Sequence, residues 1–159
     1  MKIKRILPDG CLIQAGIDTS TLIRLFLGDW HGIEFKIYQN FFQIHVSKTV
    51  LKEFEYFRKF EHSLKLKYEF LALLGVKILK NEGHHENFRD NDELIVQECM
   101  SHGLNMLITD NVAHFQALQQ KYLSLKVVNG FSIPYYFFPF MNHDEKVGTC
   151  LHNGIITLL

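Results

Sequence analysis

The feature that most constrains the fold of this chain is the alternation of short apolar segments with longer amphipathic patterns. Residues 11–17 are a largely apolar run, as expected for a strand that is buried on both faces. Between such runs, apolar residues recur every third or fourth position, which is the period of a helix with one buried face. Strands that alternate with helices form a parallel sheet that helices cover on both sides. We therefore predict an α/β protein with three layers, α/β/α, around a central, mostly parallel sheet.

The individual elements can be placed from local signals. Asp18 to Thr21 supplies carboxylate and hydroxyl groups that mark the start of a helix, and Ser47 marks another helix start. Gly75 is placed to end a helix in the left-handed conformation. We predict helices at 19–27, 33–42, 48–60, 62–74, 90–101 and through 115–118, strands at 11–17, 76–79, 105–109 and 125–128, and a loop at 81–89. The segment 43–46 is predicted either as a strand or as an extended entry to the next helix.

The chain of 159 residues fits one domain, with its core at about 12–128. The segment 131–159 begins with aromatic residues and matches no clear element, so we interpret it as a C-terminal extension that forms a lid or an interface. No apolar run approaches the roughly 20 residues needed to cross a bilayer. The cysteines are few and scattered, which indicates reduced thiols: Cys11, Cys99 and Cys150. We expect a cytoplasmic protein without membrane contact.

Acidic residues follow the strands at the positions where parallel sheets gather functional groups. Asp18 follows the first strand, and Asp110 follows the strand 105–109. Asp92 lies in the first turn of a helix that leads into that strand, and Glu53 lies in the first turns of another helix. Carboxylates that meet at one edge of a sheet repel one another unless a cation lies among them. Oxygen ligands suit Mg²⁺ or Mn²⁺, which can orient a water for attack on a phosphodiester.

The order and spacing of these residues resemble the PIN-domain ribonuclease family. Residues 17–23 (Ile-Asp-Thr-Ser-Thr-Leu-Ile) are similar to the opening strand, turn and helix of that family, and residues 47–54 are similar to the helix that carries its glutamate. Residues 92–95, followed by 107–111, resemble its later helix and strand, and 114–115 (His-Phe) match its aromatic close. The resemblance covers roughly residues 12 to 128 and implies a three-layer PIN-like domain.

The resemblance further implies a metal-dependent endoribonuclease. Its Mg²⁺ or Mn²⁺ would be held by four catalytic acids: Asp18, Glu53, Asp92 and Asp110. Supporting side chains are Thr19, Thr109 and Asn111. Family members commonly place the last acid two residues after the threonine, where this chain has Asn111, whereas Asp110 follows the threonine directly. Either residue, or both, can complete the site.

The resemblance also implies partners. The substrate is expected to be RNA. Some members of the family are the toxin components of bacterial toxin–antitoxin pairs, which would add an antitoxin-like protein partner and a homodimer. The alternative is a PIN-like module that no longer cleaves and binds RNA or protein. It is motivated by the Asp110/Asn111 ambiguity and by the formal net charge of zero, since nucleic-acid binders often carry a basic surplus.

Each acid also has a purely structural interpretation. Asp18 can cap its helix, and Asp92 can be a first-turn acid favoured by the helix dipole, a role for which Asp90 competes. Glu53 can be a solvated helical acid. A phosphatase of the haloacid-dehalogenase type is disfavoured because Ser20 stands where its second aspartate is required. Zinc is disfavoured because Cys99 and His102 lack a matching second pair.

Cationic and aromatic side chains could contact RNA. The cations near the Glu53 helix either meet phosphates or form a solvated face: Lys48, Lys52, Arg58 and Lys59. Two aromatic segments, 30–31 and 135–140, either stack on bases or are buried against the sheet or a partner.

Overall fold

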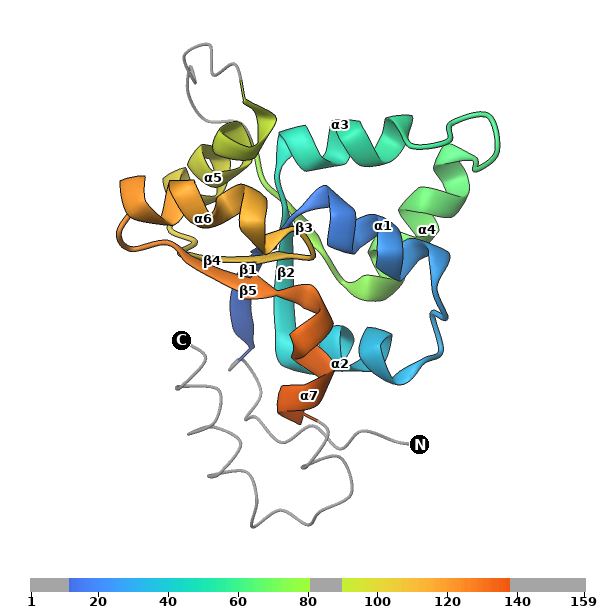
Figure 1. Ribbon diagram of the computed structural model, residues 1–159. Coiled ribbons are helices and arrows are strands. Elements are labelled where there is room, and N and C mark those ends of the chain that lie inside the picture. Colours follow the sequence, from blue (N-terminus) through green and yellow to red (C-terminus); the bar gives the residue numbers. More distant parts are fainter. Residues whose placement is uncertain (1–11, 81–89, 138–159) are drawn as a thin grey trace.

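The central element of the protein is a parallel sheet with the strand order β3-β2-β1-β4-β5 (Figure 1). The structure is a computed structural model that describes residues 12–80 and 90–137. All strand pairs among these residues are parallel, where the sequence predicted a mostly parallel sheet. The strands are β1 (Ile13–Ile17), β2 (Phe42–Val46), β3 (Lys77–Ile78), β4 (Met106–Thr109) and β5 (Lys126–Asn129).

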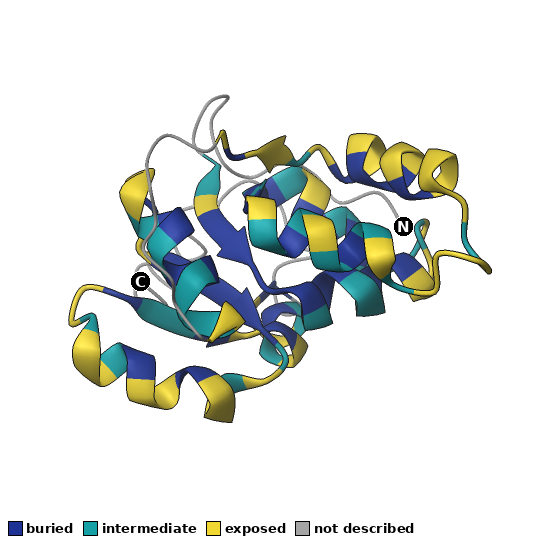
Figure 2. Cartoon of the chain, turned by 90° about the horizontal axis from the view of Figure 1, so that it is seen from above, coloured by how far each residue is buried: buried dark blue, intermediate teal, exposed yellow. Residues whose placement is uncertain are grey.

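Helices cover both faces of this sheet, which confirms the predicted three-layer α/β/α architecture. The helices are α1 (Thr19–Leu27), α2 (Ile33–Phe41), α3 (Lys48–Tyr56), α4 (Leu64–Leu74), α5 (Asn91–Ser101), α6 (Val112–Lys121) and α7 (Ile133–Phe137), with a short 3₁₀ turn, η1 (Gly130–Ser132), before α7. In Figure 1, α5 and α6 lie on one side of the sheet and α1 and α4 on the other. The central strands β1, β2 and β4 are largely buried, whereas the edge strands β3 and β5 are more exposed (Figure 2).

The strand order creates a switch point in the middle of the sheet. From β1 the chain builds the sheet outward through β2 to β3, and it then returns to add β4 and β5 on the other side of β1. β1 pairs with β4 through Gly16 with Leu107 and Ile17 with Ile108. In open parallel sheets, ligands bind beyond the carboxyl ends of the strands at such a point. Here the two strands end immediately before Asp18 and Asp110.

The predicted helix 48–60 is too long, because α3 ends at Tyr56. Arg58 adopts a left-handed backbone conformation with φ of 42°, which does not continue a helix. The Lys67 side chain, which is fully buried, donates from Nζ to the carbonyl oxygens of Glu55 and Phe57. A cation placed against these last carbonyls satisfies acceptors that the end of a helix leaves free.

Other boundaries shift by one or two residues. Residues 42–46 form a strand, so the first of the two predictions for 43–46 is confirmed and α2 ends one residue earlier than expected. The helix predicted at 62–74 begins at Leu64, because Ser63 accepts a hydrogen bond from the Leu66 amide at 3.1 Å. Gly75 ends α4 with φ of 76°, as predicted. The predicted loop 81–89 lies outside the described residues.

Aromatic side chains form much of the core. Phe70 of α4 makes ring contacts with Phe26, Phe35 and Phe54 from three other helices. Trp30 also packs on Phe26 and Phe70, and its indole N–H donates to the Phe26 carbonyl oxygen at 2.8 Å. Of the two interpretations of this tryptophan, the structure therefore supports packing against the core, in which Trp30 is partly buried.

The first part of the C-terminal segment belongs to the folded core. Phe137 of α7 is buried and stacks on Phe41 of α2, with ring centroids 4.7 Å apart. Tyr135 on the same helix is exposed. The remainder of the predicted extension, residues 138–159, lies outside the described residues. In the described part of the chain, no helix is long and apolar enough to cross a membrane.

Candidate functional site

Asp18 lies at the switch point and is held from both central strands. Its backbone N–H donates to the Ile108 carbonyl oxygen at 2.8 Å, which extends the pairing of β1 with β4 by one residue. Its side chain is buried, and Oδ2 accepts from the hydroxyls of Ser20 at 2.8 Å and Thr109 at 2.9 Å. Asp18 occupies the N-cap position of α1, but its side chain makes no cap hydrogen bond. The carboxylate is therefore oriented by hydroxyl groups rather than used as a helix cap.

Glu53 is brought to the same region by α3. The hydroxyl of Thr19, the residue after Asp18, donates to Glu53 Oε1 at 3.0 Å. Partial burial raises the pKa of Glu53, and the negative charges of Asp18 and Asp92 raise it further, while the hydrogen bond from Thr19 opposes the shift. Glu53 is thus a half-buried acid within the electrostatic field of two other carboxylates, rather than a fully solvated one.

Asp92 in the first turn of α5 is the third member of this group. Asp90 Oδ1 accepts from the Asp92 amide at 3.0 Å, so Asp90 serves as the N-cap and leaves the Asp92 side chain free for another role. Partial burial raises the pKa of Asp92, and the charges of Asp90 and Asp18 add to this shift. His114 Nδ1 lies 3.8 Å from Asp92 Oδ2 and acts in the opposite direction.

Asp18, Glu53 and Asp92 therefore form an acidic cluster at the carboxyl end of the sheet. Among the described residues, neither Asp18 nor Glu53 forms an ion pair with a lysine or arginine. Within residues 12–80 and 90–137, no three His, Cys, Asp or Glu side chains converge closely enough to hold a metal ion as they stand. Ligation by all three acids would therefore require side-chain rotation.

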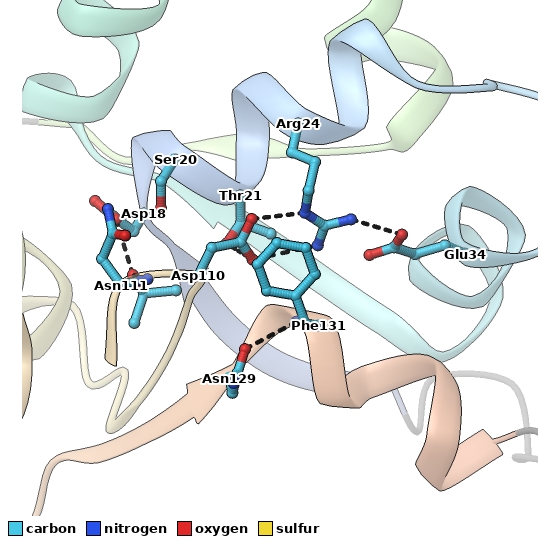
Figure 3. Close-up of polar contacts among 10 residues, drawn as sticks. Asp18, Ser20, Thr21, Arg24, Glu34, Asp110, Asn111, Asn129 and Phe131 are labelled. Carbon is cyan, nitrogen blue, oxygen red and sulfur yellow. Dashed lines mark hydrogen bonds and ion pairs between the residues drawn. The ribbon is translucent and has the colours of Figure 1, made fainter. Parts of the chain in front are cut away.

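Asp110, the fourth predicted acid, is engaged elsewhere. Its Oδ2 accepts from Arg24 Nε at 2.6 Å, and its Oδ1 accepts from Arg24 Nη2 at 3.2 Å and from the Thr21 hydroxyl at 2.9 Å. This is a two-pronged pairing of a guanidinium with a carboxylate, a strong and directional contact. Figure 3 shows the Asp110 side chain turned toward Arg24.

Asn111 lies on the opposite side of the chain from Asp110. Its backbone N–H donates to the Thr109 hydroxyl oxygen at 3.0 Å, and that hydroxyl in turn donates to Asp18. In Figure 3 the Asn111 side chain is directed to the side of Asp18, and the Asp110 side chain to the side of Arg24. The position that faces the acidic cluster after β4 thus carries an uncharged amide.

The arginine that holds Asp110 was not found from the sequence. Arg24 also donates from Nη1 to Glu34 Oε2 at 2.7 Å, and its guanidinium carbon lies 4.4 Å from the centre of the Phe131 ring (Figure 3). Thr21 and Arg24 are three residues apart on one helix and so share a face. That spacing was the available signal for a joint contact with a carboxylate, but nothing in the sequence identifies Asp110 as the partner.

The backbone at Gly130 lies close to the side chains of Asp110 and Thr21. A Cβ atom at Gly130 would lie 2.3 Å from Asp110 Oδ1 and 2.9 Å from the Thr21 hydroxyl oxygen. The chain leaving β5 therefore passes directly over the carboxylate, which only a glycine permits. The result is a packed unit beside the acidic cluster, in which Arg24 pairs with both Asp110 and Glu34.

Cys99 and His102, which come nearest to a zinc-ligand pair in the sequence, have other contacts in the structure. Cys99 is buried, and burial raises the pKa of its thiol to about 12. His102 Nδ1 lies 2.9 Å from the Glu98 carbonyl oxygen. Cys11 and Cys150 lie outside the described residues.

Comparisons of the chain with models of known protein families, with curated proteins and with solved structures find no match.

Proposed function

We propose that the protein is a metal-dependent endoribonuclease of the PIN type, in which Asp18, Glu53 and Asp92 hold Mg²⁺ or Mn²⁺. One observation carries this proposal. Asp18, Glu53 and Asp92 gather at the carboxyl end of the sheet, where burial and the charges of neighbouring carboxylates raise the pKa values of Glu53 and Asp92, and neither Asp18 nor Glu53 has a cationic partner among the described residues. A divalent cation among three such groups relieves this repulsion.

The donor set fits a hard cation. All three side chains offer carboxylate oxygen, which suits Mg²⁺ and Mn²⁺. Mg²⁺ usually keeps several waters and takes only one or two carboxylates together with substrate phosphate, so a loose arrangement of acids is compatible with it. When bound, the ion supplies charge neutralisation on the phosphodiester and lowers the pKa of a water.

The other side chains of the cluster orient these acids. Ser20 and Thr109 hold one oxygen of Asp18, and no hydrogen bond within the described residues engages its Oδ1, which is left for a ligand. Thr19 similarly holds Oε1 of Glu53. We assign Asn111 a neutral contact to the ion or to a substrate phosphate. The contacts of Asp110 with Arg24 disfavour the prediction that Asp110 is a ligand.

The proposal is tested by measuring Mn²⁺ binding and Mn²⁺-dependent cleavage of a mixed RNA panel. Wild type is compared with Asp18→Asn and Asp92→Asn, and the exposed Asp29 provides a matched control as Asp29→Asn. We expect wild type and the control to bind and cut, and both cluster variants to be folded and silent. Equal activity in all four proteins would show that the cleavage comes from a contaminant and would overturn the proposal.

A second candidate is an RNA-binding or protein-interaction module that does not cleave. Two observations favour it: no three donor side chains converge in the described part of the chain, and Asn111 stands where an acid is common. A folded protein without measurable Mn²⁺ binding would support this candidate over the first. An antitoxin-like partner and a homodimer stay predictions from the resemblance alone.

A further inference from the structure

An exposed surface that mixes cations with aromatic rings runs along α3 and into the turn that follows. We call it the α3 surface, and its members are Lys48, Lys52, Tyr56, Lys59 and Phe60. Lys48, Lys52 and Tyr56 are four residues apart, so they line one stripe of the helix. All five side chains are exposed, with Tyr56 at 72% and Phe60 at 94% of full exposure.

The aromatic part of the α3 surface is organised around one cation. Lys59 Nζ lies 4.7 Å from the centre of the Tyr56 ring and 5.0 Å from that of Phe60. The left-handed conformation of Arg58 turns the chain so that residues on both sides of it meet in this way. The two rings are therefore held together with a positive charge, yet both remain open to solvent.

The α3 surface is positively charged although the whole chain has a formal net charge of zero. Lys48, Lys52 and Lys59 form no ion pair with any described residue. Three acids belong to the same segment: Glu53 accepts from the Thr19 hydroxyl, Glu55 accepts from the Tyr68 hydroxyl at 2.7 Å, and Glu61 lies 3.9 Å from Arg58. Since none of the three pairs with these lysines, the lysines can neutralise a polyanion.

The α3 surface begins beside the acidic cluster. Glu53 lies on the same helix, three residues before Tyr56, which is about 4.5 Å along the helix axis. A chain bound along the α3 surface would therefore pass close to the acids that are proposed to act on it.

We propose that the α3 surface binds a single-stranded segment of RNA, with bases stacked on Tyr56 and Phe60 and phosphates beside the three lysines. This inference rests on the proposed function and names the form of its substrate. Exposed rings can stack only on bases whose faces are free, which a duplex does not offer. The cores of protein interfaces are depleted in lysine, so the interleaved cations favour nucleic acid over a protein partner.

The test measures binding without cleavage. A fluorescein-labelled oligouridylate of roughly twelve nucleotides, within the site sizes of single-strand binders, is titrated with the full chain in EDTA and followed by fluorescence anisotropy. We expect Tyr56→Ala and Phe60→Ala each to weaken binding by about fivefold or more. Lys52→Ala and Lys59→Ala should each lower the slope of log affinity against log salt by about 0.7. Tyr135→Ala is the control, since this exposed ring lies on α7, at the far end of the molecule from α3 (Figure 1).

Several results would overturn the inference. These are failure of wild type to bind the oligonucleotide, equal binding by wild type and the ring variants, and stronger binding of the matching duplex. A change of oligomeric state in Tyr56→Ala or Phe60→Ala, without loss of RNA binding, would assign the surface to a protein partner instead. The proposed nuclease activity is judged separately: binding that the ring variants lose, in a protein that never cleaves, supports the α3 surface and refutes the nuclease.

Discussion

The substitution Asp110→Asn tests whether Asp110 stabilises the fold by pairing with Arg24 or binds the metal ion as a ligand. Asp110 is 9% exposed at its side chain and accepts three hydrogen bonds, two from Arg24 and one from Thr21. Asparagine keeps the shape and one acceptor oxygen, but its amide nitrogen must then face an N–H or O–H donor on one side. The substitution therefore removes the negative charge and introduces a donor–donor contact in a packed site.

The expected cost follows from the burial of the two partners. Removing one partner of a fully buried ion pair costs about 3–5 kcal/mol. Arg24 is 27% exposed and keeps its contact with Glu34, so we expect a cost below that range, about 2 kcal/mol. In a domain of this size, 1 kcal/mol shifts Tm by about 2–4 °C, which predicts a fall of about 4–8 °C.

The assay is thermal unfolding followed by circular dichroism, together with calorimetric titration of Mn²⁺. Asp110→Asn should lower Tm as stated and still bind Mn²⁺ below that temperature. Asp18→Asn should not lower Tm, because Oδ of the asparagine can still accept from the hydroxyls of Ser20 and Thr109. It should abolish Mn²⁺ binding, because a negative charge is lost from the acidic cluster. The reasoning is refuted if Asp110→Asn melts like wild type and no longer binds Mn²⁺, since Asp110 would then be a ligand rather than the partner of Arg24.

Four further predictions concern Gly130, the acidic cluster and Cys99. Gly130→Ala should destabilise the protein by about 1–3 kcal/mol in urea unfolding, because the added methyl group meets Asp110 at 2.3 Å; an unchanged midpoint would contradict this close approach. Because folding raises the pKa values of Glu53 and Asp92, their contribution to stability is present below the unfolded pKa and is lost as pH rises through the folded pKa; in the metal-free protein, this contribution to Tm should therefore fall from acid to neutral pH. At neutral pH, Mn²⁺ at a hundred times its Kd should restore about 2.7 kcal/mol, and no gain in Tm would refute the metal site. Cys99, whose pKa is about 12, should resist iodoacetamide at pH 8 until the protein unfolds, as judged by peptide mapping; rapid labelling of the native protein would contradict its burial.

The layered fold was predictable because its signals are local. Buried strands are recognised as short apolar runs, and helices as apolar residues that recur every third or fourth position. Helix ends are marked by capping residues such as Ser47 and Gly75. Each of these signals lies within a few residues of the element that it describes. Chain order then limits the topology, since parallel strands need helical crossovers. The position of Asp18 at the edge of the sheet follows from the end of its strand.

Details that depend on distant contacts were not predictable. The end of α3 is set in part by Lys67, which reaches back from the next helix to the carbonyl oxygens of Glu55 and Phe57. The helical period continues beyond Tyr56 in the sequence, so the pattern alone predicts a longer helix. The α3 surface also depends on this turn, which brings Lys59 against two rings.

The sequence by itself determined which residues end the central strands and therefore which acids gather at the switch point. Only the tertiary structure showed which of the two neighbouring side chains, Asp110 or Asn111, lies on the side of Asp18. The deciding contact joins Arg24 to Asp110 across 86 positions of the chain, and a guanidinium pairs with whichever carboxylate the folded chain brings within reach. The chain bends directly after β4, and the neighbouring side chains leave that bend on different sides, Asp110 toward Arg24 and Asn111 toward Asp18 (Figure 3).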